Sequence, residues 1–264
     1  MLGAIAGDVI GSAYEANAVK TTDFDLFPPG AGFTDDTVLT VATAEALLGN
    51  GDYAVAYRRL GRAFPHVGYG GSFYRWLFRD GAGPYGSWGN GAAMRVSPVG
   101  FALDSVDAVL AEAALSAAVT HDHPEGIKGA QATALAVFLA RSDADKEIIK
   151  AELAGRFGYD LTRCLNAIRP GYRFDVSCQG SVPESLIALL ESADYQSAVR
   201  NAISLGGDAD TMACIAGGIA HAFYGSVPEP IAGEVRTRLP DGLLDVLDRF
   251  EHRYGLPSSA TSRR

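Results

Sequence analysis

Residues 106–119 read VDAVLAEAALSAAV and indicate the fold class, because their apolar residues recur at intervals of three and four. That spacing gathers them on one face of an α-helix, whereas a half-buried strand alternates apolar and polar residues. Alternating patterns are scarce in this chain. We therefore predict an all-α protein, with helices in the segments rich in alanine, leucine and valine: 37–48, 105–119, 127–141, 184–191, 196–205 and 209–223.

Two glycine-bearing segments predict close helix packing. The segment 211-TMACIAGGIAHAF-223 is apolar on nearly every side, which is typical of a buried helix. The segment 7-GDVIGSAYE-15 places Gly7, Gly11 and Glu15 at four-residue spacing, so they share one face if this segment is helical. We expect the glycines to admit a neighbouring backbone and Glu15 to reach a cleft. The alternative for Glu15 is a solvated position at a helix end.

The length and composition fit a packed globular chain. It has 264 residues, of which 48% are hydrophobic and 20% charged. This length fits one large domain or two small ones, and no linker, repeat or low-complexity tract divides it. We therefore assign one domain to residues 1–256 and expect residues 257–264 to form a frayed tail.

The formal charge of −9, with no run of Lys or Arg, argues against nucleic-acid or membrane-surface binding, since both require basic patches. No apolar stretch of about 18 residues is present to span a membrane. The apolar N-terminus lacks the basic start of a signal peptide. Cys164, Cys178 and Cys214 show no CxxC spacing, so we expect buried, reduced thiols and a cytoplasmic protein.

Adjacent carboxylates open the apolar segment 33-FTDDTVLTVATAEALL-48. Asp35 and Asp36 are flanked by threonines, and residues 21–57 contain no Lys or Arg. Capping of a helix N-terminus explains one aspartate, because its oxygen accepts backbone N–H groups. Two adjacent carboxylates repel one another, so their proximity indicates that a cation binds between them.

The segment 204-SLGGDADTMACIAGG-218 repeats this pattern. Asp208 and Asp210 precede an apolar helix, and residues 201–235 again contain no Lys or Arg. Coincidental capping is less credible at two distant segments. Carboxylate and hydroxyl oxygens suit Mg²⁺ or Mn²⁺, whereas Zn²⁺ favours His and Cys. Four carboxylates exceed what one Mg²⁺ usually needs, so we predict two divalent ions close together.

Long glycine-rich loops are predicted at 68–71 and 81–100, and the second contains 86-GSWGNGAAMRV-96. Its glycines can bring backbone N–H groups against a phosphate, and Trp88 offers an aromatic face for a base. By itself this signal is weak, because glycine-rich loops are common. His121 and His123 precede a helix expected to begin near Pro124. For this pair, a ligand contact or a structural role is favoured over metal binding.

Together these motifs resemble the ADP-ribosylglycohydrolase family, the relatives of the dinitrogenase-reductase-activating glycohydrolase. The resemblance runs from GAIAGDVIGSAYE near residue 3 to GGDADTMACIAGGIAHAFYG, which ends at residue 225. Between them lie FTDDT, WGNGAAMRVSPVG, THDHPEGIKGA and SCQGSVPESLIALLES. The ordered pair FTDDT and GGDADT on an all-α chain is the specific part of the resemblance.

The resemblance implies a compact, single-domain, orthogonal helix bundle that is monomeric and holds two Mg²⁺ or Mn²⁺ ions in a cleft. The residues that match the metal ligands of the family are Thr34, Asp35, Asp36, Asp208, Asp210 and Thr211. The matching ligand-binding residues are Gly86, Ser87, Trp88, Gly89, Asn90, Gly91 and His121. The stretch 177–183 resembles a part of the family that lies near the ligand.

The implied reaction is hydrolysis at C1 of the distal ribose of an ADP-ribosylated protein or small molecule, with release of ADP-ribose. Glu15, or the metal-binding carboxylates Asp35 and Asp36, would supply acid–base catalysis. A nucleic acid is expected as a partner only if it is itself the ADP-ribosylated substrate. Two alternatives stay open at this point: a binuclear nucleotide phosphohydrolase, and an ADP-ribose-binding protein without catalysis.

Overall fold

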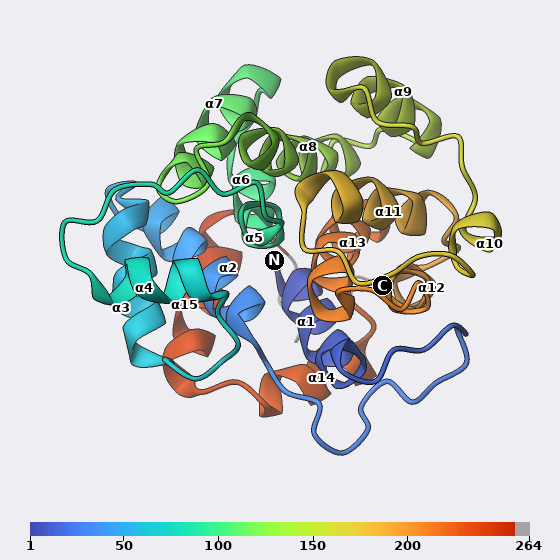
Figure 1. The fold of residues 1–264 in the computed structure, drawn as a ribbon, viewed down its shortest axis with the longest axis horizontal. Coiled ribbons are helices and arrows are strands. Elements are labelled where there is room, and N and C mark those ends of the chain that lie inside the picture. The colour runs from blue at the N-terminus through green and yellow to red at the C-terminus, as the bar shows by residue number, and fades with distance from the viewer. Residues whose placement is uncertain (257–264) are drawn as a thin grey trace.

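Helices α1 (Leu2–Glu15) and α13 (Ala209–Tyr224) pack against one another at the centre of the computed structural model, which describes residues 1–256 (Figure 1). The two helices run antiparallel, since Gly3 meets Gly217 and Gly11 meets Ala209. Both helices are buried along most of their length. This confirms the buried helix that the apolar pattern of residues 211–223 predicted.

Glycines make this close packing possible. A methyl group added to Gly7 would lie 2.0 Å from the carbonyl oxygen of Ala213, and one added to Gly11 would lie 2.5 Å from that of Ala209. No side chain larger than hydrogen fits such gaps without displacing one helix. The predicted role of the shared glycine face is therefore confirmed. As a consequence, the C-terminal end of α1 lies beside the first turn of α13.

The other helices surround this pair, and the described residues contain no β-strand (Figure 1). Helices α11, α12 and α8 pack on α13, while α3 and α15 pack on α2. The predicted all-α fold is confirmed. In chain order the remaining helices are α2 (Asp35–Leu48), α3 (Tyr53–Ala63), α4 (Gly71–Phe78), α5 (Gly91–Met94), α6 (Ser97–Ala102), α7 (Val106–Ala118), α8 (Pro124–Arg141), α9 (Lys146–Phe157), α10 (Leu165–Ile168), α11 (Cys178–Leu190), α12 (Tyr195–Ile203), α14 (Glu229–Thr237) and α15 (Asp241–Arg253).

Several helix boundaries differ from the predictions. The expected helix 184–191 begins earlier, at Cys178, because Ser177 caps the segment by accepting the N–H of Gly180. The expected loop 81–100 is wrong in its second half, where α5 and α6 form. Helices α3, α9, α14 and α15 contain no run of alanine, leucine and valine and were not predicted, because they are rich in charged residues on their solvent-facing sides.

Two further predictions have clear outcomes. Cys178 and Cys214 are buried thiols as expected, but the prediction is wrong for Cys164, which is exposed at the start of the short helix α10. Within residues 1–256, no helix combines the length and apolar character that crossing a membrane requires. The predicted tail at 257–264 lies outside the described residues.

Candidate metal and ligand site

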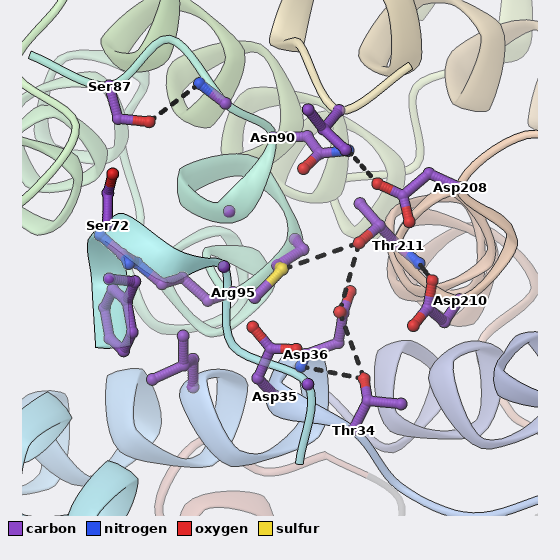
Figure 2. A pocket seen from close by; sticks show the side chains of 18 of the residues that line it. Thr34, Asp35, Asp36, Ser72, Ser87, Asn90, Arg95, Asp208, Asp210 and Thr211 are labelled. Atoms are coloured by element: carbon purple, nitrogen blue, oxygen red, sulfur yellow. Dashed lines mark hydrogen bonds between the residues drawn. The ribbon is translucent and has the colours of Figure 1, made fainter. Parts of the chain in front are cut away.

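Three helix ends meet at a cavity of about 430 Å³, a size within the range of roughly 300–1,000 Å³ that is typical of ligand pockets (Figure 2). The C-terminal end of α1 contributes Glu15, and the N-terminal ends of α2 and α13 contribute aspartates. Polar residues predicted from sequence that line this cavity are Glu15, Thr34, Asp35, Asp36, Ser87, Asn90, His121, Asp208, Asp210 and Thr211. The fold therefore brings the separate motifs together.

Asp8 belongs to this cluster, although the sequence analysis assigned it no role. It is fully buried in α1, and its carboxylate accepts hydrogen bonds from Thr34 N (2.9 Å), Thr34 Oγ1 (2.7 Å) and Thr37 N (3.0 Å). The hydroxyl of Thr37 also donates to it. A signal was present in the sequence, because Asp8 is the single acidic residue of the apolar segment 2–14. A buried aspartate in such a segment needs partners.

The carboxylates form two groups that share one member. Asp8, Asp36 and Asp210 present oxygens within 4.8 Å of one another, and so do Glu15, Asp208 and Asp210. No Lys or Arg within residues 1–256 forms an ion pair with any of these five residues. Asp210 therefore lies where the two groups meet, as expected of a residue that bridges two cations.

Burial and mutual repulsion make the ionised state of these groups unfavourable. Burial, and secondly the charge of Asp210, raise the pKa of Asp8 to about 7. The same two causes raise the pKa of Asp36 and of Asp208 well above the ordinary range, and raise the pKa of Glu15. Carboxylates so close together ionise jointly only when positive charge compensates them.

The donor set fits a hard divalent cation. Asp36 Oδ1 is buried and has no hydrogen-bond donor within the described residues. Its other oxygen accepts from Thr211 Oγ1 at 3.2 Å and lies 3.4 Å from Thr34 Oγ1, whose shorter bond is the one to Asp8 (Figure 2). The groups facing this position are carboxylate and hydroxyl oxygens, which Mg²⁺ and Mn²⁺ prefer. The residues present therefore fit the predicted metal, although they do not identify it.

Thr34 and Asp35 also have structural roles at the start of α2. The side chain of Thr34 caps the helix by accepting the N–H of Asp36, and the N–H of Asp35 donates to Val67 O at 2.9 Å. Asp35 lines the cavity but belongs to neither of the two carboxylate groups. Capping residues and the candidate metal ligand Asp36 thus lie side by side in the FTDDT motif.

The glycine-rich loop forms another part of the cavity. Ser87, Gly89, Asn90 and Gly91 line it, while Gly86 and Trp88 do not. Trp88 is 55% exposed, and its ring lies in an edge-to-face arrangement with that of His123. Asn90 Nδ2 donates to Asp208 Oδ2 at 2.7 Å (Figure 2). This bond ties the loop directly to the carboxylate cluster.

The segment before α11 is joined to the glycine-rich loop by backbone hydrogen bonds. Asn90 N donates to Val176 O at 2.8 Å, and Cys178 N donates to Trp88 O at 3.0 Å. The stretch 177–183, which the resemblance placed near the ligand, therefore supports the loop, while the preceding Phe174 and Val176 line the cavity. Sequence reasoning missed these two residues, because nothing local distinguishes them from other loop residues.

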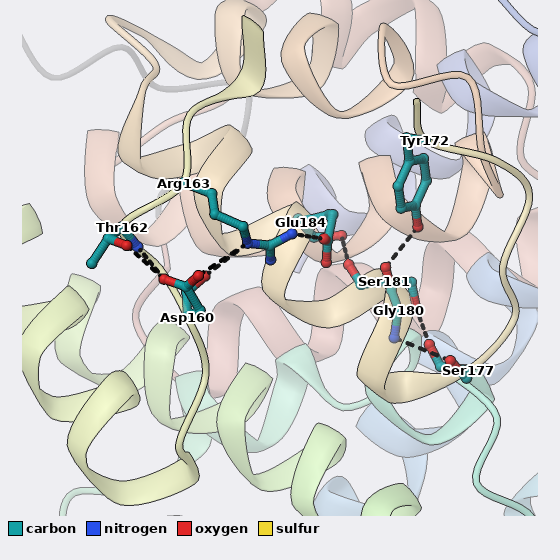
Figure 3. Close-up of polar contacts among 9 residues, drawn as sticks. Asp160, Thr162, Arg163, Tyr172, Ser177, Gly180, Ser181 and Glu184 are labelled. Atoms are coloured by element: carbon teal, nitrogen blue, oxygen red, sulfur yellow. Dashed lines mark hydrogen bonds and ion pairs between the residues drawn. The ribbon is translucent and has the colours of Figure 1, made fainter. Parts of the chain in front are cut away.

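A polar network anchors this segment at both ends (Figure 3). Tyr172 OH donates to Gly180 O at 2.7 Å, and Ser181 Oγ donates to Ser177 O at 2.6 Å. Arg163 Nη1 forms an ion pair at 2.6 Å with Glu184, a largely buried residue of α11. The chain between Tyr172 and Ser177 is thereby fixed to α11, so Phe174 and Val176 form a defined wall of the cavity.

The two histidines have different surroundings. His121 is buried, lines the cavity and has a pKa lowered well below its ordinary value by burial and secondly by the charge of Arg95. His123 caps α8, where its Nδ1 accepts the N–H of Glu125 at 3.1 Å. Neither histidine belongs to a carboxylate group that fits a metal. Arg95 also borders the cavity, and the sequence analysis did not predict it.

Comparison with known proteins identifies the family. The family model described as ADP-ribosylglycohydrolase matches residues 1–259. The chain belongs to the ADP-ribosylglycohydrolase family. Among members of this family, ADP-ribosylhydrolase ARH3 of Homo sapiens is 29% identical over 87% of this chain and 86% of its own length. ARH3 of Mus musculus is 30% identical over 87% of this chain and 84% of its own.

A bacterial relative and a solved structure extend the comparison. The ADP-ribosylarginine hydrolase Tri1 of Pseudomonas putida (strain GB-1) is 28% identical over 85% of this chain and 69% of its own length. A solved structure titled ADP-ribosylglycohydrolase-related protein complex superposes with a TM-score of 0.65 at 27% identity, covering 97% of this chain and 94% of the other. The ADP-ribosylglycohydrolase fold therefore extends over nearly the whole chain.

Proposed function

We propose that this protein hydrolyses the glycosidic bond at C1 of the distal ribose of an ADP-ribosylated acceptor and releases ADP-ribose. The observation that carries the proposal is the opposite charge at two parts of one cavity. Carboxylates without a basic partner gather at the ends of α1, α2 and α13, while the buried guanidinium of Arg95 lies near the glycine-rich loop. ADP-ribose has matching parts: a ribose with hydroxyls, and a pyrophosphate with negative charge.

At the acidic part, Asp8, Asp36 and Asp210 would hold one divalent ion, and Glu15, Asp208 and Asp210 a second. The hydroxyls of Thr34 and Thr211, and the carboxylate of Asp35, stay predicted ligands. Bound Mg²⁺ or Mn²⁺ would supply stabilisation of negative charge and a more acidic water. The chain itself positions the carboxylates, since α1 and α13 are fixed to one another by their glycine contacts.

At the other part, Arg95 and the loop would hold the pyrophosphate. Arg95 has no carboxylate partner in the described chain, and its Nε and Nη1 are buried without acceptors. A buried cation of this kind attracts an anion strongly, because little water screens its charge. The backbone N–H groups of Ser87 and Trp88 likewise have no acceptor within the described part of the chain. Phe174 and Val176 add apolar surface.

The hydrolysis breaks the bond between C1 of the ribose and the acceptor atom. Water adds its hydroxyl to C1, and its remaining proton reaches the acceptor, so that ADP-ribose and the unmodified acceptor leave. Glu15 is placed for the proton transfers, because it lies at the cavity edge and its pKa is raised by burial and by Asp210. Positive charge that develops at C1 is stabilised by the surrounding carboxylates.

Release of ADP-ribose from defined peptides tests this proposal. Arginine-linked and serine-linked ADP-ribosyl peptides are incubated with the protein in Mg²⁺, in Mn²⁺ and in EDTA. Metal-dependent release from one peptide supports the proposal and identifies the acceptor. Release of AMP or inorganic phosphate instead would indicate a nucleotide phosphohydrolase. ADP-ribose binding without release from either peptide, or from other linkages, would indicate a binding protein.

A further inference from the structure

A buried chain of polar side chains runs from Arg95 through Thr120 to His121. Arg95 Nη2 lies 3.0 Å from Thr120 Oγ1, which lies 2.8 Å from His121 Nδ1. The same Nη2 donates to the carbonyl oxygen of Ser116 at 3.0 Å, and the guanidinium packs 4.2 Å from the ring centre of Tyr57. Arg95 and Thr120 are fully buried and His121 is 5% exposed, so water does not substitute for these bonds.

The direction of these hydrogen bonds follows from the donors available. A guanidinium only donates, so Thr120 Oγ1 accepts from Arg95. The threonine hydroxyl has one proton to donate. Apart from His121 Nδ1, Thr120 Oγ1 has no hydrogen-bonded acceptor in residues 1–256, and the Tyr85 hydroxyl is the other polar group close to it. If Nδ1 were protonated, the hydroxyl proton would lose its hydrogen-bonded acceptor in a buried site, which is unfavourable.

We propose that Arg95 and Thr120 are positioning residues that fix His121 as the tautomer protonated at Nε2. His121 Nε2 faces the glycine-rich loop: a methyl group added to Gly91 would lie 3.1 Å from it, and one added to Gly89 would lie 3.7 Å from it. The fixed tautomer therefore presents an N–H donor to a ligand oxygen on that loop. That this oxygen belongs to the pyrophosphate or its neighbouring ribose rests on the proposed function.

Because His121 is neutral, its tautomer decides whether Nε2 offers the ligand a proton or a lone pair. Burial and the nearby Arg95 lower the pKa of His121 well below its ordinary value, so the ring carries a single N–H near neutral pH. If that proton were on Nδ1, the lone pair of Nε2 would face the ligand and repel an anionic oxygen. Besides the direct role proposed for its Nε and Nη1, Arg95 thus also acts on the ligand indirectly, through the hydroxyl of Thr120 and the imidazole of His121.

Nitrogen-15 NMR of the protein without ligand tests the tautomer directly, because protonated and unprotonated ring nitrogens differ in chemical shift. We expect wild-type His121 to be protonated at Nε2. Thr120→Ser, which keeps the hydroxyl, should preserve this state. Thr120→Val, which removes it, should give a detectable Nδ1–H population. Tyr85→Phe removes the other hydroxyl near Thr120 and should leave the tautomer unchanged.

Ser116→Ala is the matched control. It removes a buried hydroxyl on α7 that bonds to Ala113 O, but keeps the carbonyl that accepts from Arg95. We expect the His121 spectrum of this variant to match that of wild type. A wild-type His121 protonated at Nδ1, or a Thr120→Val spectrum identical to that of wild type, would overturn the proposal. The wild-type measurement needs no variant to fold.

Calorimetry with ADP-ribose and Mg²⁺ then measures the consequence for binding. We expect Kd to rise about tenfold in Thr120→Val, the effect of losing one hydrogen bond to a charged ligand, and to change little in Thr120→Ser and Ser116→Ala. An unchanged Kd in Thr120→Val would overturn the predicted ligand contact. If wild-type protein does not bind ADP-ribose, the proposed function fails, while the NMR result still decides the tautomer.

Discussion

The carboxylate cluster and the glycine-rich loop form two parts of one cavity, but they are assembled differently. The cluster joins residues far apart in sequence: Asp36 and Thr211, in hydrogen-bond contact, are 175 positions apart. The loop residues Ser87 to Gly91 are consecutive. The cluster holds excess negative charge that only the folded chain concentrates, whereas the loop offers neutral donors beside one buried cation. Substitutions should therefore affect turnover and metal response at the cluster, and ligand affinity at the loop.

Asp36→Asn should have the largest effect, because it removes a charge shared by the cluster while keeping the shape. We expect kcat to fall by about 10³-fold or more, the scale for loss of a central catalytic group. The rise in Tm that Mg²⁺ produces should disappear. The matched control is Asp107→Asn, which also lies in a first helical turn but is exposed on α7. Retained turnover in Asp36→Asn would exclude its metal role.

Glu15→Gln should lower kcat by about 10²-fold, within the usual range for loss of a general acid or base. Because Glu15 is exposed at the cavity edge and only part of its side chain is enclosed, Tm in EDTA should change little. Turnover of the ADP-ribosyl peptides and thermal denaturation measure the two effects. Glu147→Gln, an exposed glutamate in the first turn of α9, is the control. Unchanged turnover in Glu15→Gln would assign the proton transfers to another carboxylate.

Gly7→Ala tests whether packing of α1 on α13 creates the cluster. The added methyl would lie 2.0 Å from Ala213 O, so we expect a loss of about 3 kcal/mol in the free energy of unfolding and weaker Mg²⁺ binding. Urea denaturation and metal titration measure these effects. Gly155→Ala is the control, because a methyl there meets open space on α9 and should stabilise the helix slightly. Equal stability of the two variants would contradict the packing argument.

The stability of the metal-depleted protein should fall as pH rises. The pKa of Asp8 is raised from 3.8 to about 7 in the folded protein, so the folded state holds this proton more tightly than the unfolded state does. The stabilisation is complete below pH 4 and is lost as pH passes through about 7. In EDTA, we expect Tm to be several degrees lower at pH 8 than at pH 5. Mg²⁺ should raise Tm more at pH 8, where protons compete less with the metal. An EDTA Tm that rises with pH would contradict this assignment.

Of these changes, Trp88→Ala should have the smallest effect, and the quantity it alters should be the affinity for ADP-ribose. If the base of ADP-ribose extends beyond the cavity and stacks on this exposed ring, Kd should rise about tenfold with kcat nearly unchanged. Calorimetry and steady-state kinetics separate the two quantities. Phe174→Ala, which alters the apolar wall of the cavity, provides the comparison. An affinity that falls only in Phe174→Ala would place the base inside the cavity.

Much of the fold and part of the site were predictable from local sequence. Segments rich in alanine, leucine and valine predicted most of the buried helices, including α13, and the glycine spacing of residues 7–15 predicted close approach of a neighbouring backbone if that segment is helical. Amphipathic helices such as α3 and α15 were not predicted because their buried residues, which recur at three- and four-residue spacing, are separated by charged residues and form no run of alanine, leucine and valine. Acidic helix starts without basic neighbours indicated a cation, because like charges in adjacent positions need compensation.

By itself, the sequence determined that Asp35, Asp36, Asp208 and Asp210 begin apolar helices without a basic residue nearby, since this is a property of neighbours along the chain. Only the tertiary structure decided that Asp8 completes one carboxylate group and that Asp35 belongs to neither. It alone joined Arg95 to His121 through Thr120. These relations depend on how helices distant in sequence approach one another. Packing of complementary surfaces determines how these helices approach one another, and no local pattern of residues predicts that arrangement.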